Sequence, residues 1–314
     1  MKSLSENSKL VTLFLASRPK FLVASAAPIL VGSSLAYATT GSFNPGLFIL
    51  ALSAIIALHS GANITNDYFD HLSGNDWVNK NPTPFSGGRR YIQQGILSAR
   101  ATLLTALFFF TLGSVIGIVI VLLTKSLFIL IIGIIGLLGG FFYTAPPLKI
   151  GYRCAGELVI ALLFGLLPVY ASYYLQTETI DTFSLLPAAI VAILIFLVIL
   201  INEFPDAPAD ATVNKKTLVV YFGVPASMWI YRIALIGSFV IAAAMLLYRS
   251  LFFAGLLYLI TLPIAAFAIK STNKKDLATP GQYRASQITV LLHAIGSLAL
   301  TIGFIITGLR NTAV

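Results

Sequence analysis

The stretch "LLPAAIVAILIFLVILINEF" (residues 185–204) carries no charged side chain before Glu203. A helix needs roughly 20 apolar residues to cross the hydrocarbon core of a bilayer, and this stretch is long enough to do so. The whole chain of 314 residues has the same character, because 58% of it is hydrophobic and only 10% is charged. This composition excludes an ordinary soluble protein and predicts a polytopic membrane protein.

Nine apolar segments predict an all-α fold, in which residues 1–314 form a single domain built as one bundle of nine transmembrane helices. The segments are Phe21–Ala38, Leu47–Phe69, Ala101–Leu123, Leu127–Phe142, Gly156–Leu175, Leu185–Phe204, Ala226–Tyr248, Leu251–Ile269 and Gln287–Leu309.

The distribution of positive charge predicts the orientation of this bundle. With the amino terminus in the cytoplasm, only Lys125, Arg249 and Arg310 of the twenty Lys and Arg residues fall outside. Cytoplasmic loops are enriched in Lys and Arg, so the pattern predicts a cytoplasmic amino terminus in the inner (cell) membrane. The same bias accounts for the net charge of +9 without a nucleic-acid partner.

Six of the eleven acidic residues gather at the predicted cytoplasmic ends of the second and sixth segments. In the first of these clusters, Asn63, Asp67 and Asp70 follow a helical spacing that places them on one face. Asp76 follows in the loop after Gly74.

The second cluster contains Glu203 and three polar residues at successive i+4 positions, Asn202, Asp206 and Asp210. Proline lacks the backbone donor that a helix interior needs. Pro205 and Pro208 are therefore expected to break the helix here and to leave an irregular turn rather than a straight face.

Carboxylates gathered so closely repel one another and become protonated unless a cation compensates them. Oxygen ligands without His or Cys favour a hard cation, and Mg²⁺ characteristically takes one or two carboxylates together with substrate phosphate. The two clusters therefore predict a magnesium diphosphate clamp. Its metal ligands would be Asp67, Asp70, Asp76, Asp206 and Asp210.

Basic side chains in the neighbouring loops are candidates for diphosphate contact. Cytoplasmic charge bias alone would also place them there, so both interpretations stay open for each. The candidates are Arg89, Arg90, Lys149, Arg153, Lys215 and Lys216.

Four stretches resemble the UbiA superfamily of intramembrane prenyltransferases, over most of the chain. "NDYFD" (66–70) and "NEFPDAPAD" (202–210), the latter followed by "KKT" (215–217), are similar to the two aspartate-rich motifs of that family. "SRPKFLVASAAPILVG" (17–32) resembles its first helix. "YTAPPLKIGYRCAGELVIALLFGLLPVYASYYLQT" (143–177) resembles the 1,4-dihydroxy-2-naphthoate prenyltransferase branch of menaquinone biosynthesis.

The resemblance implies nine helices and a transfer of an isoprenyl chain from an isoprenyl diphosphate to an aromatic acceptor, assisted by Mg²⁺. It implies that the metal and the diphosphate are organised by Asn66, Asp67, Asp70, Asp206 and Asp210. It also matches Tyr143, Lys149 and Arg153 to positions associated with diphosphate binding and with acceptor or cation handling.

Two departures from the family pattern bear on the acceptor more than on the reaction. The loop "NPTPFSGGRR" (81–90) and the prolines of the second motif are unusual for a naphthoate enzyme. Another quinone precursor, a porphyrin-type alcohol or a lipid glycerol are the alternative acceptors. An ion-coupled transporter is the alternative of another class, but it should carry its acids near the bilayer midplane rather than at one end.

Overall fold

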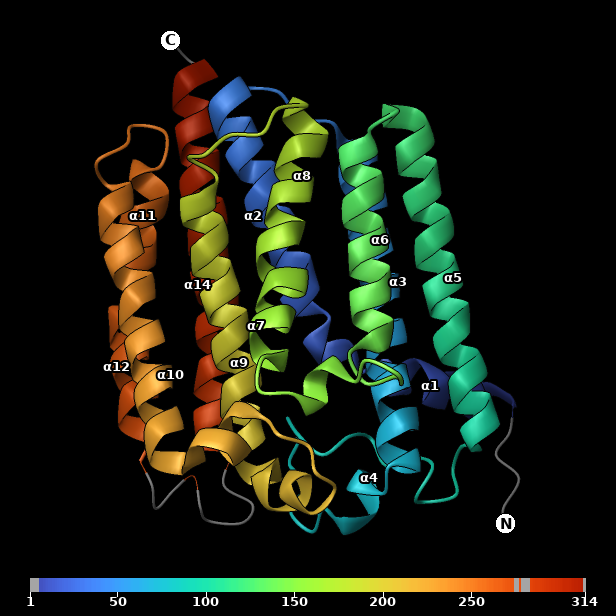
Figure 1. The fold of residues 1–314 in the computed structure, drawn as a ribbon. Coiled ribbons are helices and arrows are strands. Elements are labelled where there is room, and N and C mark those ends of the chain that lie inside the picture. The colour runs from blue at the N-terminus through green and yellow to red at the C-terminus, as the bar shows by residue number, and fades with distance from the viewer. Residues whose placement is uncertain (1–5, 274–276, 278–282, 313–314) are drawn as a thin grey trace.

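Apolar segments of this length form helices because a helix satisfies its own backbone hydrogen bonds where no water is present. The computed structural model describes residues 6–273, 277 and 283–312, and these contain helices and loops without a strand. The long helices stand side by side, with the short helix α4 and several loops at one end (Figure 1). We call this the α4 end of the bundle. Lys2, Lys274 and Lys275, which entered the charge count, lie outside the described residues.

The helices have the following bounds in chain order: α1 (Glu6–Ala16), η1 (Pro19–Phe21), α2 (Val23–Thr40), α3 (Pro45–Leu72), α4 (Asn75–Val78), α5 (Ala99–Thr124), α6 (Leu127–Phe142), η2 (Ile150–Tyr152), α7 (Gly156–Ala161), the π-helical η3 (Leu162–Leu166), α8 (Leu167–Thr177), α9 (Leu185–Thr212), α10 (Leu218–Met245), α11 (Phe252–Leu259), α12 (Leu262–Ser271) and α14 (Arg284–Thr312).

Seven spans in the described part of the chain are long and apolar enough to cross a membrane as single helices, with α7, η3 and α8 forming one of them. The pair α11 and α12 is bent by 45° and makes an eighth span if it crosses as one unit. Helix α6 has the predicted bounds but only 16 residues, which is short for a complete crossing. The chain is a multi-pass membrane protein.

The expectation that prolines break α9 is wrong. The helix runs from Leu185 to Thr212 with Pro205 and Pro208 inside it. Each proline removes one backbone hydrogen bond, but its fixed φ is compatible with a helix, so the turns on either side continue. As a result, Asn202, Asp206 and Asp210 lie along one face of an unbroken helix.

Helix α9 is the most enclosed element among the candidate spans, and α5 is the least. The main core cluster joins α9 to α2, α8, α10, α11 and α14, whereas α5 and α6 pack beside α3 on the other side of the bundle (Figure 1). Small residues permit several of these contacts, as is usual where membrane helices approach closely. A Cβ atom added to Gly303 of α14 would lie 2.3 Å from Ala254 Cα of α11.

Gly303→Ala is therefore expected to destabilise the protein by about 1–3 kcal/mol, because the two backbones must separate. Gly237→Ala on α10 is the matched control, since a Cβ atom there meets nothing within 4 Å. Alanine is also the better helix former, so this control should be neutral or stabilising. Thermal unfolding of the purified protein in detergent measures both variants. Equal stability of the two would contradict the close approach of α11 and α14.

Candidate active site

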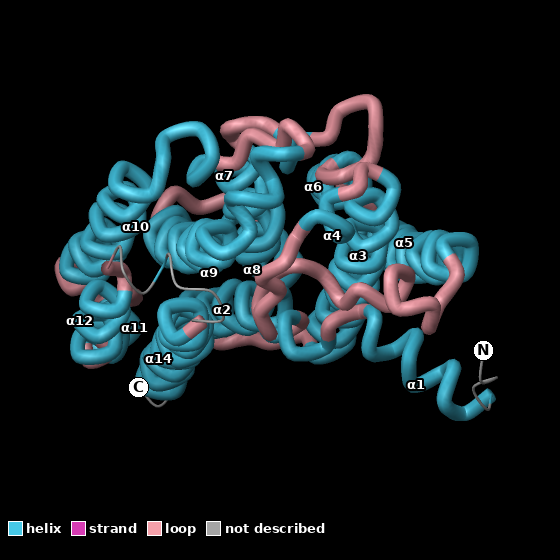
Figure 2. The backbone as a smooth tube through the Cα atoms, turned by 90° about the horizontal axis from the view of Figure 1, so that it is seen from below, coloured by secondary structure: helices cyan, strands magenta, loops and turns pink. Residues whose placement is uncertain are grey.

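A cavity of about 200 Å³ opens at the α4 end of the bundle, between α3, α9 and the loops that follow α3 and α6. Seen from this end, loops lie across the ends of the long helices (Figure 2). Both acidic clusters contribute to its wall, through Asp70 and Asp76 on one side and Asp206 and Asp210 on the other. The two clusters, predicted from distant parts of the sequence, therefore face one space.

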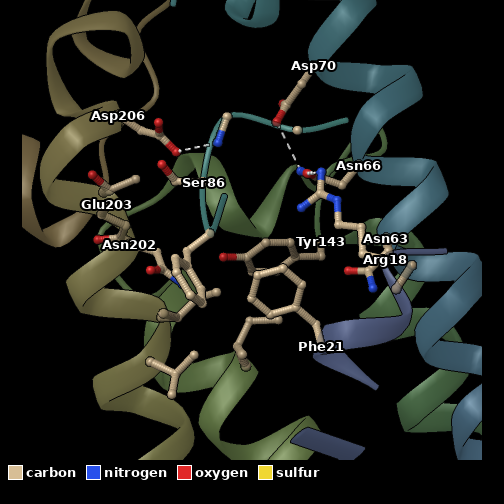
Figure 3. A pocket seen from close by; sticks show the side chains of 18 of the residues that line it. Arg18, Phe21, Asn63, Asn66, Asp70, Ser86, Tyr143, Asn202, Glu203 and Asp206 are labelled. Atoms are coloured by element: carbon tan, nitrogen blue, oxygen red, sulfur yellow. Dashed lines mark hydrogen bonds between the residues drawn. The ribbon is translucent and has the colours of Figure 1, made fainter. Parts of the chain in front are cut away.

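The first cluster is held by donors from three parts of the chain. Arg18, just before η1, forms an ion pair with Asp67 and also donates to Asn66 Oδ1 at 3.2 Å. Asn66 Nδ2 in turn donates to Asp70 Oδ2 at 3.0 Å, and the Tyr152 hydroxyl donates to Asp70 Oδ1 at 2.9 Å. These contacts leave the face of α3 with fixed side chains pointing toward the cavity (Figure 3).

Asp76 lies in α4, which starts directly after Gly74 in the left-handed region at φ 83°. Gln93 Nε2 donates to Asp76 Oδ2 at 3.1 Å. Burial, followed by the neighbouring carboxylates of Asp70 and Asp67, raises the pKa of Asp76 to about 8. A carboxyl group with so high a pKa has too little positive charge around it to stay ionised at neutral pH.

Two side-chain amides, one in α4 and one directly after it, connect the clusters. Asn75 Nδ2 donates to Asp210 Oδ1 at 2.9 Å, and Asn79 Nδ2 donates to Asp206 Oδ1 at 2.8 Å. The loop before α5 adds the Gly87 backbone amide, which donates to Asp206 Oδ2 at 3.1 Å. The segment after α3 thus reaches across to α9 and fixes the second motif opposite the first.

Lys215 joins the two clusters electrostatically. Its Nζ atom lies 3.4 Å from Asp210 Oδ1 and 3.7 Å from Asp70 Oδ2. Burial alone would lower the pKa of Lys215, but the carboxylates of Asp70 and Asp210 raise it well above its usual value. The lysine therefore stays charged between the two motifs.

The structure brings most of the predicted site residues to this cavity. Nine of them line it: Asn63, Asn66, Asp70, Asp76, Tyr143, Asn202, Asp206, Asp210 and Lys215. Asp67 lies directly behind Arg18, with which it pairs.

Five predicted basic residues do not line the cavity: Arg89, Arg90, Lys149, Arg153 and Lys216. The side chain of Arg90 donates to the Asp76 carbonyl at 2.6 Å, and Lys149 Nζ lies 5.2 Å from the centre of the Tyr152 ring. Arg153 and Lys216 are exposed. Their roles in diphosphate contact stay predictions.

Four residues that shape the site were not among the residues predicted from the sequence. Arg18 entered only the charge bias, and Asn75, Asn79 and Tyr152 were not candidates. The two asparagines flank Asp76 with a spacing of four in "NDWVN" (75–79), which is a helical signal for amides on one face. Arg18 carries no such local signal, because its partner Asp67 lies 49 residues away.

Tyr143 owes its place to two glycines that follow α6, Gly151 in η2 and Gly156 at the start of α7. A Cβ atom on Gly151 would lie 2.7 Å from the Tyr143 ring, and one on Gly156 would lie 3.4 Å from its hydroxyl oxygen. The ring consequently packs over bare backbone, with its hydroxyl pointing toward the α9 wall of the pocket (Figure 3).

The carboxylates do not form a ready-made metal cage. Across the described residues, no three His, Cys, Asp or Glu side chains are grouped closely enough to hold a metal ion. Even so, the site fits an oxygen-liganded cation. A Cβ atom on Gly88 would lie 3.0 Å from Asp67 Oδ1 and 3.2 Å from Asp76 Oδ1, and the buried Asn75 Oδ1 has no hydrogen-bond partner. This set of oxygens suits Mg²⁺, which uses few protein ligands and completes its shell with phosphate and water.

A second cavity of about 330 Å³ lies between α3, α5, α6 and the η3–α8 region, and its walls are almost entirely apolar. Leu58, Leu137 and Leu163 line it, and each has a neighbour on the same helix that lines the polar cavity. The bundle therefore offers a polar cavity at the α4 end and an apolar cavity farther along α3 and α6.

An all-helical membrane bundle with two aspartate clusters facing one cavity defines an intramembrane enzyme rather than a soluble one. The model of the UbiA prenyltransferase family matches residues 25–284. The chain belongs to this family, and it is a prenyltransferase.

Curated relatives include the 1,4-dihydroxy-2-naphthoate octaprenyltransferases of Haemophilus influenzae and Escherichia coli. The first is 31% identical over 95% of this chain and 98% of the relative, and the second is 30% identical over 79% and 80%. Among solved structures, a UbiA homolog from Archaeoglobus fulgidus bound to GPP and Mg²⁺ superposes with a TM-score of 0.70. It is 16% identical and covers 96% of this chain and 100% of that chain.

The ion pair of Arg18 and Asp67 yields a stability prediction. Removing one partner leaves the other charge buried, so Arg18→Met and Asp67→Asn should each destabilise the protein by about 3 kcal/mol. The double variant should lose clearly less than the sum of the two, because neither charge is then left alone. Thermal unfolding of the four proteins measures this coupling, with the exposed Arg153→Met as a control. Strictly additive losses would show that the two side chains do not interact.

Proposed function

We propose that this protein transfers an isoprenyl chain from an isoprenyl diphosphate to an aromatic acceptor, 1,4-dihydroxy-2-naphthoate being the acceptor we favour. The observation that carries the proposal is the meeting of both aspartate clusters at one cavity through Asn75, Asn79 and Lys215. A diphosphate needs cationic donor groups around it, and Arg18 and Lys215 in the cavity wall supply them.

In this proposal, Asp67, Asp70, Asp76, Asp206 and Asp210 hold Mg²⁺. Bound magnesium would offset the charge that develops on the pyrophosphate as it leaves. Support for metal dependence comes from the Archaeoglobus fulgidus structures with Mg²⁺ and either GPP or DMAPP, two isoprenyl diphosphates.

The chain's own residues would stabilise the departing group and protect the allylic cation. Lys215 and Arg18 present fixed positive charge to the diphosphate oxygens, and preorganised charge of this kind is a major source of catalysis. The cavity wall beyond them carries Phe21, Tyr143 and Phe164, whose ring faces attract a cation and exclude water. Acceptor attack would take place in this aromatic part of the cavity.

We also propose nine crossings, with the amino terminus and the active site at the cytoplasmic face of the inner membrane. The α4 end holds the loops with Arg89, Arg90 and Lys149, whereas Lys125 and Arg249 lie at the opposite end, between α5 and α6 and between α10 and α11. This asymmetry agrees with the positive-inside rule. The bacterial naphthoate relatives support the choice of membrane and acceptor.

The proposal is tested with purified protein in lipid nanodiscs, an isoprenyl diphosphate and 1,4-dihydroxy-2-naphthoate. We expect product and pyrophosphate to form only with Mg²⁺. Asp70→Asn and Asp206→Asn should reduce turnover by at least about a hundredfold, because each removes a carboxylate that would hold Mg²⁺ beside the diphosphate. Glu178→Gln, at an exposed position outside the cavity, is the matched control. Undiminished turnover after removal of divalent metal would refute the proposed reaction.

We assign the hydrocarbon tail of the donor to the apolar cavity, which yields a further prediction. Gly133 lines this cavity, and a Cβ atom on it meets nothing within 4 Å. Gly133→Leu should therefore fill space that a long tail needs and lower kcat/KM for long donors by roughly tenfold, as overpacking of an apolar site does. Short donors should be little affected. Gly237→Leu, outside the cavity, is the control, and an equal loss for both donor lengths would contradict the assignment.

A further inference from the structure

Glu203 is a buried acid on the cavity wall, and the proposed diphosphate site gives it no role. It is 8% exposed, as is its neighbour Asn202, and both line the cavity from α9. Glu203 Oε2 and Asn202 Oδ1 are buried and accept no hydrogen bond in the described part of the chain. Buried polar atoms normally have partners, so two orphaned acceptors side by side indicate a missing donor.

The neighbour of Glu203 does not supply this donor. Glu203 lies against Glu157, and two carboxyl groups hydrogen-bond each other only when the pair holds a proton. Glu157 Oε1 already accepts from the Leu218 backbone amide at 2.7 Å, which ties the pair to the start of α10. The contact with Glu157 therefore leaves Glu203 Oε2 without a partner and Glu203 with unused acceptor capacity.

These unpaired acceptors decide what kind of ligand fits. A diphosphate offers mainly further acceptor oxygens, whereas a hydroxyl group donates a hydrogen bond and would satisfy Glu203 Oε2 or Asn202 Oδ1. Glu203 lies about one helical turn from Asp206, toward the apolar side of the cavity, where Ile195, Val198 and Ile199 of the same helix continue the wall. In Figure 3, Asn202 and Glu203 lie on the α9 side, and the Tyr143 hydroxyl points toward them.

We propose that Glu203 and Asn202 bind a hydroxyl group of the aromatic acceptor, whose ring lies beside Tyr143. This inference rests on the proposed function and adds the acceptor subsite to it. A phenolic hydroxyl that donates to a buried carboxyl oxygen becomes more electron-releasing, so the contact both orients the ring and enriches the carbon that attacks. An oxidised quinone has only carbonyl oxygens at these positions and gives Glu203 nothing to accept. The subsite therefore selects hydroxylated acceptors.

The test compares acceptor affinities with and without a hydroxyl group on the acceptor, and with and without the carboxyl group of Glu203. The probes are 1,4-dihydroxy-2-naphthoate, measured by its KM, and its 1-hydroxy and 4-hydroxy analogues, measured as competitive inhibitors. Wild type should bind one of the analogues about 10- to 100-fold more weakly than the dihydroxy compound, the range for leaving a buried acceptor without its donor. Glu203→Ala should bind all three within about threefold of one another, with the KM for the isoprenyl diphosphate unchanged.

Two further variants make the result decisive. Glu178→Ala, an exposed acid outside the cavity, should keep the full wild-type preference. If Glu203→Ala does not fold, Glu203→Met decides, and it should also lose the preference because its side chain has a similar length but no oxygen that accepts the hydroxyl.

The outcomes separate the two proposals. If the wild-type protein transfers the isoprenyl chain but the Glu203 variants keep the full preference, the subsite is overturned and the proposed function stays intact. If the wild-type protein transfers nothing to 1,4-dihydroxy-2-naphthoate, both proposals are overturned.

Discussion

The α4 end of the bundle depends on the hydrogen bonds that join the segment after α3 to α9. Four aspartates line one small cavity, and such a gathering of like charges is unfavourable unless donors and cations surround it. Asn75 in α4 and Asn79 directly after it supply donors, and Lys215 supplies a charge from the loop before α10. Without these contacts the two motifs would repel each other and the cavity would open.

The polar cavity and the apolar cavity form chemically different zones along the helices. At the α4 end, Arg18 and Lys215 provide the positive charge that a diphosphate requires. Beyond them the walls become aromatic and then apolar, as an allylic cation and a hydrocarbon tail require. Glu203 lines the polar cavity on the α9 side, where we propose that the acceptor ring binds.

The unusual loop at residues 81–90 forms part of the cavity wall. Its residues Ser86, Gly87 and Gly88 line the cavity, and the Gly87 amide donates to Asp206. Gly87 and Gly88 both adopt positive φ values, 77° and 69°, which let the backbone pass close to the carboxylates. A departure in sequence from the naphthoate pattern thus coincides with a backbone contact to the second motif.

The sequence by itself determined the helical segments, the two aspartate clusters and the family, because each of these is a local pattern of residue type and spacing. Even the bounds of α6 agree with the prediction. Only the tertiary structure decided that Lys215 rather than Lys216 enters the cavity, that Arg18 pairs with Asp67, and that Glu203 meets Glu157. Those pairings join residues that are far apart in the chain, and the packing of whole helices fixes them, so no local pattern reveals them.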